Sequence, residues 1–434
     1  MTFDYTFDID TGHVTILDGS TEIPNNIFKD RREVKSVTIP DSVTSIGDYA
    51  FQNIRLTEVV IPNSVTTIGD YAFEWNELTE VSLGNSVTSI GSLAFAYTNL
   101  TEIILPDSLT SIEHAAFFVN DLTEVVIPNS VTLIGSQAFG HNNLTEVYIG
   151  NSVTRIEWMA FEGNQLTSLV IPDAATYIGE KAFDENNLTE VELGNSVDWI
   201  GINAFSNNSL SEIAIPDSVE YIGSYAFAYN DLTELTLPDG IERINIATFL
   251  NNDLEEVVIP ESVTSIGASA FAGNELTELT IPESVILIND RAFRSNDLTK
   301  IFIPDSVTHI NDEAFANNNI SQAILPSQFE DNPPYAAFDL GVEFIYREGI
   351  PGDKNRDGFV DEVTNYQLWT ESGGVDLRHR RGRTYSDGSS GYWNAVKAVK
   401  VDGGFSVLVE GLWEHTEGKY KVVSANNRGV IRRV

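Results

Sequence analysis

Hydrophobic and polar positions recur with a constant spacing of 22 residues over most of the chain. The segment LTEVVIPNSVTTIGDYAFEWNE, which begins at Leu56, shows the pattern in full. An earlier copy opens at Val34 and a truncated last copy at Ile320, which makes 13 full repeats without an insertion. The other copies begin at Leu78, Leu100, Leu122, Leu144, Leu166, Leu188, Leu210, Leu232, Leu254, Leu276 and Leu298. Such regularity indicates that one small structural unit stacks on the next.

Each repeat predicts a short strand followed by turns. In Leu56–Ile61 apolar side chains alternate with polar ones such as Glu58, which is the period of a β-strand. Pro62 lacks an N–H group and ends the strand, and Gly69 permits a turn. Ala72–Phe73 fits a short helical turn in which the ring fills the coil. Successive strands would then pair in a parallel ladder.

A single repeat cannot fold alone. Its apolar side chains, about seven, would contribute roughly 10–20 kcal/mol on burial, whereas ordering its backbone and side chains costs roughly 20–40 kcal/mol. Stacking buries both faces of each coil, so an array of repeats can fold. Asn recurs from Asn76 to Asn318 at one place in the repeat, with Thr98 as the exception. We expect this Asn to be buried and to bond loop backbone groups of the next coil.

The string L-T-E-V-V-I-P-N-S-V-T-T-I-G-D-Y-A-F resembles the BspA-type leucine-rich repeat over roughly residues 14–326. The resemblance implies a β-rich α/β fold: a leucine-rich-repeat solenoid of 22-residue repeats with short parallel strands and short helical turns. It also implies a surface or secreted adhesin that binds matrix proteins, other cells or host receptors. Many family members carry Cys where this chain carries Asn76, and their period is often 23, so the resemblance leaves the partner open.

Charge divides the chain in two. The whole chain carries a formal net charge of −39, yet residues 350–434 hold 13 Lys and Arg against 11 Asp and Glu. Residues 1–349 therefore carry a net charge of −41. The predicted domains are an N-terminal cap (1–33), the solenoid (34–326), a C-terminal cap and linker (327–349) and a small, mostly β C-terminal module (350–434).

Composition excludes several classes of protein. A strongly acidic chain lacks the basic surface that binding to nucleic acids or to anionic membranes requires, which excludes nucleic-acid-binding proteins and proteins that adhere to such membranes. With no Cys, the chain has no disulfide and no thiolate metal site. No stretch of about 18 apolar residues exists, and the start, MTFDYTFDID, shows no signal peptide. The high acidity and the lack of Cys suit export by a C-terminal signal.

A segment at the start of the C-terminal module has the D-x-N-x-D-G-x-x-D spacing of a calcium loop. Oxygens at alternate positions can converge on one hard cation. The twelfth position is Thr364 rather than the bidentate Glu of an EF-hand, and the alternative is an acidic turn held by its own hydrogen bonds. The candidate ligands are Asp353, Asn355, Asp357, Asp361 and the backbone carbonyl of Phe359.

The rest of this module predicts strands at Phe405–Val409, Leu412–Glu414 and Tyr420–Ser424. Its motif GGFSVLVEG…W…GKYKVVSANNRGV resembles the tryptophan-rich C-terminal modules of cyanobacterial surface and secreted proteins. The resemblance implies a surface or exported bacterial protein and no particular reaction.

Two groups of exposed side chains are candidate binding residues. One is a row of carboxylates on the strand face, for a cation or a basic partner; the alternative is a solvated face that prevents aggregation. Its members are Glu58, Glu80, Glu102, Glu124, Glu146, Glu190, Glu212, Glu234, Glu256 and Glu278. The other group is aromatic, since such residues are enriched in recognition patches; the alternative is loose packing at the rim. It comprises Trp75, Tyr97 and His141 after the repeat Phe, with Tyr148 and Phe302 on the strand.

No enzyme signature is present: the six His residues are scattered, and neither a nucleophile elbow nor a P-loop occurs. The sequence predicts a non-catalytic, extracellular or cell-surface protein for binding or adhesion, which recognises a protein or glycan partner through the solenoid face. The alternative is a cytoplasmic scaffold for protein–protein interaction. Calcium is the one cofactor that the sequence indicates.

Overall fold

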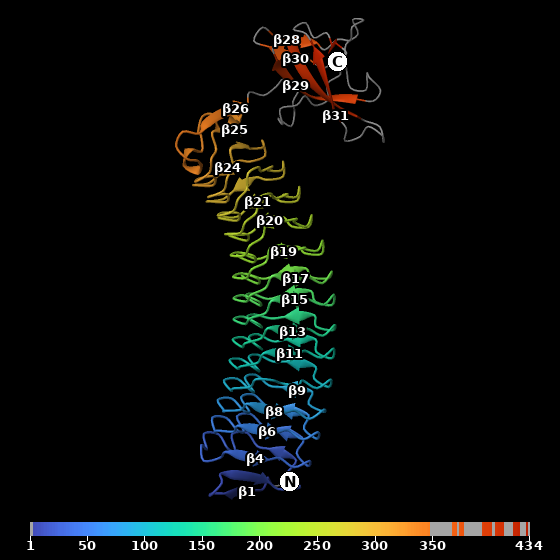
Figure 1. The fold of residues 1–434 in the computed structure, drawn as a ribbon, viewed down its shortest axis with the longest axis vertical. Helices are drawn as coiled ribbons and strands as arrows, with labels where there is room; N and C mark the ends of the chain where they lie inside the picture. The colour runs from blue at the N-terminus through green and yellow to red at the C-terminus, as the bar shows by residue number, and fades with distance from the viewer. Residues whose placement is uncertain are drawn as a thin grey trace. The chain divides into compact units, whose positions relative to one another are not determined.

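The computed structural model describes residues 3–347 and, after them, the strands β27 to β32 between residues 367 and 432. The chain forms two compact units. The larger unit contains nearly all of the repeats, and the smaller contains residues 344–434 with two short segments from the last coils. In the larger unit the repeats form coils that stack one on another (Figure 1), which confirms the predicted solenoid.

The predicted strand of each repeat forms one side of the solenoid. Strands pair in parallel with the equivalent strand 22 residues away, for example Val59 with Val81, and the middle residue points inward. Isolated bridges link Ala214, Thr236 and Val258 in the same way. The strands of this side are β4 (Ser36–Thr38), β6 (Glu58–Val60), β8 (Glu80–Ser82), β11 (Glu124–Val126), β13 (Glu146–Tyr148), β15 (Ser168–Val170), β17 (Glu190–Glu192) and β23 (Lys300–Phe302).

A second parallel ladder, which the sequence did not predict, lies further along each coil. Each of its strands has only two residues, of which the second is an inward-facing Ile. A strand of two residues is too short to show an alternation of apolar and polar residues in the sequence. One sheet contains β3 (Glu22–Ile23), β5 (Ser45–Ile46), β7 (Thr67–Ile68), β9 (Ser89–Ile90), β10 (Ser111–Ile112), β12 (Leu133–Ile134), β14 (Arg155–Ile156), β16 (Tyr177–Ile178), β18 (Trp199–Ile200) and β19 (Tyr221–Ile222). Another contains β20 (Arg243–Ile244), β21 (Ser265–Ile266), β22 (Leu287–Ile288) and β24 (His309–Ile310).

The third side of the coil corrects the predicted helical turn. Ala72 and Phe73 lie in a turn, not in a helix. The neighbouring Tyr71 and Trp75 both have φ of 57°, in the left-handed region that a right-handed helix cannot contain. The amides of Tyr71, Phe73 and Trp75 instead donate to carbonyls of the following coil, at N···O distances of 2.8, 2.8 and 3.1 Å. Among residues 3–347, helix is confined to the 3₁₀ turns η1 (Ser327–Phe329) and η2 (Tyr335–Ala337).

The interior is a column of rings. One Phe from each coil stacks on the next from Phe28 to Phe338, with ring centroids 5.1–5.8 Å apart. Beside this column runs the expected buried Asn. Asn142 accepts a hydrogen bond from the Leu122 amide (3.1 Å) and donates to the carbonyls of Phe117 (3.0 Å) and Phe139 (3.1 Å). The Asn therefore ties its own coil to the preceding one, in the direction opposite to that expected.

Both ends of the array are closed by atypical segments. At the N-terminus β1 (Tyr5–Asp8) pairs antiparallel with β2 (His13–Ile16), and β2 pairs in parallel with β4 as the first rung. At the other end the chain passes through β25 (Gln322–Pro326), Phe338 stacks on Phe315, and β26 (Glu343–Arg347) follows. Such caps shield the apolar end coils, as repeat proteins require.

The smaller unit contains antiparallel strands after residue 366. β27 (Gln367–Thr370) pairs with β28 (Gly373–Asp376). β29 (Trp393–Val401), β30 (Gly404–Gly411), β31 (Tyr420–Ala425) and β32 (Ile431–Arg432) form one sheet in this order. Two of the three strands predicted in this region are therefore found. The third, Leu412–Glu414, lies outside the described residues.

Candidate functional site: the exposed faces of the solenoid

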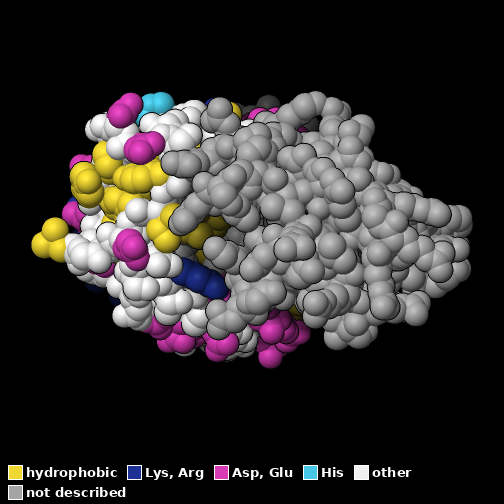
Figure 2. Space-filling model, turned by 90° about the horizontal axis from the view of Figure 1, so that it is seen from above, with side chains coloured by type: hydrophobic (Ala, Val, Ile, Leu, Met, Phe, Trp, Pro, Cys, Tyr) yellow, Lys and Arg dark blue, Asp and Glu magenta, His cyan; other side chains and the backbone are white. Residues whose placement is uncertain are grey.

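The strand face combines carboxylates with exposed apolar side chains. All ten glutamates of the predicted row are exposed, and in-register pairing places Glu58 beside Glu80 and Glu124 beside Glu146. In the end-on view of Figure 2, acidic side chains gather along one edge of the described part. Because the strands are about 4.8 Å apart, these carboxylates form a negative strip in which neighbours repel by roughly 1 kcal/mol or less. Ser168 interrupts the strip between Glu146 and Glu190.

An apolar ridge runs next to the glutamate row, two residues further along each strand. Ile104 is 84% exposed, and Val126, Tyr148 and Val170 follow it in the next coils at 62, 51 and 59%. Contiguous exposed apolar side chains with a polar rim are typical of interaction surfaces. Of the predicted residues, Tyr148 belongs to this ridge, and Phe302 (37% exposed) lies seven coils away on the same side. Tyr148 and Phe302 therefore do not form one patch.

The predicted aromatic residues after the repeat Phe lie on the turn side. The rings of Trp75 and Tyr97 stack with centroids 4.3 Å apart and planes 5° from parallel. The stack continues edge to face through Phe118 (5.6 Å from Tyr97) to His141 (5.4 Å from Phe118). This is the expected aromatic track, with Phe118 in place of its neighbour Val119. The turn side and the strand side thus hold two separate groups of candidate residues.

A second aromatic stack lies on the two-residue ladder and was missed by the sequence analysis. Tyr177, Trp199 and Tyr221 stack with centroid distances of 6.3 and 3.8 Å, and the Arg155 guanidinium lies 4.0 Å from the Tyr177 ring centre. Glu157 binds Arg155 at 2.8 Å. Aligning the repeats would have revealed this stack, because its members are spaced by 22 residues.

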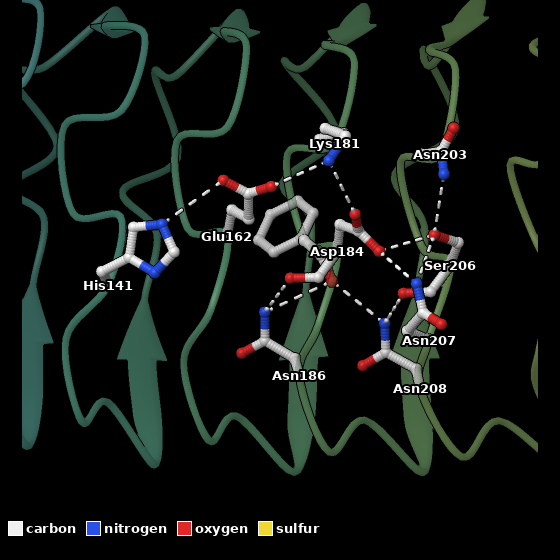
Figure 3. A network of polar contacts seen from close by, with 10 residues as sticks. His141, Glu162, Lys181, Asp184, Asn186, Asn203, Ser206, Asn207 and Asn208 are labelled. Carbon is white, nitrogen blue, oxygen red and sulfur yellow. Dashed lines mark hydrogen bonds and ion pairs between the residues drawn. The ribbon is translucent and has the colours of Figure 1, made fainter.

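A buried polar network crosses the coils C-terminal to His141 (Figure 3). Lys181 Nζ lies 3.1 Å from Glu162 Oε1 and 3.4 Å from Asp184 Oδ2, and both carboxylates are at least 90% buried. Asp184 also accepts hydrogen bonds from Ser206 (2.5 Å) and Asn207 (2.9 Å). The hydrogen bond with Glu162 raises the pKa of Lys181. Since every charge has a partner, the network holds coils together rather than leaving a group poised for catalysis.

The predicted calcium ligands Asp353, Asn355, Asp357, Phe359 and Asp361 lie outside the described residues. Within residues 3–347 no group of three or more His, Asp or Glu side chains is arranged to hold a metal ion. In the same part of the chain, no helix is long and apolar enough to cross a membrane.

The sequence matches the BspA type leucine-rich repeat region, in six copies, over residues 2–122, 110–233 and 220–339. These matches span more than three quarters of the chain. The chain belongs to the BspA-type leucine-rich repeat family. A leucine-rich repeat protein from Bacteroides ovatus has 26% sequence identity and a TM-score of 0.57, covering 80% of this chain and 98% of that chain. One from Eubacterium ventriosum has 22% identity and a TM-score of 0.47, covering 74% and 93%.

A leucine rich cell surface protein from Faecalibacterium prausnitzii has 25% identity and a TM-score of 0.43, covering 80% of this chain and 94% of that chain. A search of curated proteins finds no match. BspA-type proteins are binding proteins that include surface antigens and adhesins, so family membership supports a binding or adhesion role. The family match ends at residue 339, and the tryptophan-rich resemblance of residues 350–434 stays a prediction.

Proposed function

We propose that this BspA-type protein is a non-catalytic binding or adhesion protein, displayed at the cell surface or secreted, that recognises a protein or glycan partner through its solenoid. The observation that carries the proposal is the strand face. Exposed apolar side chains at Ile104, Val126, Tyr148 and Val170 run beside the row of glutamates on a rigid ladder, in which Ser168 takes the place of a glutamate beside Val170. The apolar ridge offers area to bury, and the glutamates favour a basic surface.

Rigidity supports this role. The interior column and the Asn ladder fix the spacing of outward side chains, so a partner meets a surface that loses little conformational freedom on binding. Electrostatic attraction between the acidic strip and a basic partner would raise the association rate and weaken as salt is added.

The test is binding of the full chain to a panel of purified extracellular-matrix proteins and glycans at low and high salt. The ridge variant carries Ile104→Ser, Val126→Ser and Tyr148→Ser, all at exposed positions. Its control, Ile246→Ser with Ile286→Ser, removes two side chains that are each 50% exposed but lie outside the strand side. We expect the ridge variant alone to lose salt-dependent binding; equal binding by both variants would refute the strand face as the site.

The location is tested by separating cells of the source organism into cytoplasm, envelope and medium, and by probing each with an antibody to the solenoid. Envelope or medium is expected. Recovery from the cytoplasm would instead favour an intracellular scaffold that uses the same face. Calcium binding by the loop at 353–361 stays part of the proposal and has its own test below.

A further inference from the structure

An open depression of about 350 Å³ lies on the turn side near the N-terminal end of the solenoid. Three successive coils contribute to it, because its lining residues come from equivalent places about 22 residues apart. They are Asp30, Arg32, Gln52, Asn53, Glu74 and Trp75. Five of the six are polar, so the depression does not suit an apolar ligand.

The indole ring of Trp75 forms one side of this depression. One face of the indole stacks on the Tyr97 ring, with the two ring centroids 4.3 Å apart. Beside it Glu74 is 94% buried and accepts a hydrogen bond from the Gln52 side chain. Burial raises the pKa of Glu74, and the hydrogen bond from Gln52 opposes that shift. Trp75 nevertheless stays 56% exposed, because its other face is directed to the coil of Asn53 and borders the depression.

The polar side chains opposite Trp75 are ordered by one another. Asn53 Nδ2 donates to Asp30 Oδ1 (2.6 Å), and Arg32 Nη2 donates to Asn53 Oδ1 (3.1 Å). These bonds leave the second Asp30 oxygen and further Arg32 N–H groups to meet a ligand. The site thus presents a fixed donor and a fixed acceptor beside a fixed ring, which is how preorganised recognition sites are built.

The backbone at Trp75 shows which residues this place accepts. Its φ of 57° is left-handed, which favours Asn and Gly over a bulky aromatic residue. At the equivalent place six other coils do carry Asn or Gly, namely Asn53, Gly163, Asn207, Asn251, Gly273 and Asn317. Six further coils carry other residues at a similar φ, namely Tyr97, Val119, His141, Glu185, Tyr229 and Ser295, so the place accepts either kind of residue.

We infer that this depression, the Trp75 site, binds a neutral pyranose residue of a glycan. A pyranose has a C–H face that packs on an aromatic ring and a hydroxyl edge that bonds carboxylate, amide and guanidinium groups. The lining carboxylates of Asp30 and Glu74 are offset by Arg32 and by Lys29, whose charge acts on Glu74. The site therefore favours a neutral ligand over a strongly charged one. The inference goes beyond the proposed function, since it adds a second site on a different side of the solenoid.

The test uses saturation-transfer NMR of the full chain with methyl glycosides of mannose, galactose and glucose at millimolar concentration. We expect at least one of them to bind through ring C–H protons, and Trp75→Asn to weaken that binding by at least about tenfold. Asn occupies the equivalent place in other coils, so this variant keeps the fold. Asp30→Asn is expected to weaken binding less, and Trp199→Ala, which removes a Trp 39% exposed on another side, should leave it unchanged.

Binding by none of the three glycosides, or equal binding by Trp75→Asn, would overturn the inference. Preferential binding of tetramethylammonium at the same ring would overturn it as well, since the site would then select a cation. The ridge variant separates the two proposals: it should keep glycoside binding, whereas Trp75→Asn should keep the salt-dependent binding of a basic protein.

Discussion

Thr98 interrupts the buried Asn ladder, and its replacement by Asn tests how the coils are joined. In the neighbouring coils the side-chain oxygen of Asn accepts the amide of a Leu 20 residues earlier, at 3.0 Å for Asn120 and 3.0 Å for Asn76. The Thr98 hydroxyl instead lies within hydrogen-bond distance of the Phe95 carbonyl and of the Asn120 side-chain oxygen, and it has a single proton to donate between them. Among the described residues, none accepts a hydrogen bond from the equivalent amide of Leu78.

We therefore expect Thr98→Asn to stabilise the protein by about 2 kcal/mol, because it satisfies one buried amide and adds donors to two carbonyls. For an array of this size that corresponds to a rise in melting temperature of about 3 °C. The assay is calorimetry together with hydrogen exchange of the Leu78 amide, which should become strongly protected. The matched reverse change, Asn142→Thr, should destabilise by a similar amount. No gain in Thr98→Asn, or an unprotected Leu78 amide in it, would refute this account of the ladder.

Three further changes test other parts of the molecule. Lys181→Met should destabilise by about 2 kcal/mol at pH 7, because it leaves Glu162 and a second buried carboxylate without their cation; urea unfolding measures this, and adding Glu162→Gln should recover part of the loss. Since the folded-state pKa of Lys181 is raised, its contribution is present below about pH 10 and is lost only as the pH rises through the folded-state value. Val119→Asn should stabilise by about 1 kcal/mol, because φ of 53° disfavours a β-branched residue; an unchanged urea midpoint would contradict this. Asp353→Ala with Asp357→Ala should abolish any rise in melting temperature on adding calcium, and a variant that still responds would place the ion elsewhere.

The sequence predicted the repeat, its strand and its interior, because those depend on positions that every coil shares. Val59 faces inward and Glu58 outward, as the alternation required. The two-residue ladder could not be predicted, since a strand such as Thr67–Ile68 has no period to detect. The helical turn was wrong for a related reason: composition at Ala72 suits a helix, but amides that bond the following coil impose left-handed residues on either side.

The candidate binding residues, like the fold, could be predicted from the sequence only in part. The carboxylate row and the Trp75–Tyr97 stack were predictable, because each repeats a residue type at one place in the coil. The Trp75 site was not, because Asp30 and Arg32 lie in the degenerate first coil, where the sequence departs from the repeat pattern. Their approach to Asn53 depends on how the coils stack, which only the three-dimensional structure shows.

The left-handed positions of the turn side connect stability with recognition. A non-glycine residue there costs roughly 1–2 kcal/mol, and a stacked aromatic pair returns roughly 0.5–1.5 kcal/mol. Trp75 and Tyr97 occupy such positions in successive coils and recover part of the cost by stacking on each other at 4.3 Å. Val119 in the next coil has no ring with which to do so. Packing alone can therefore account for the pair once both rings are present, but not for an indole face that remains exposed beside an ordered set of polar groups. Folding stability does not favour Trp over Asn at this position, whereas binding of a ligand to the exposed indole face would favour Trp.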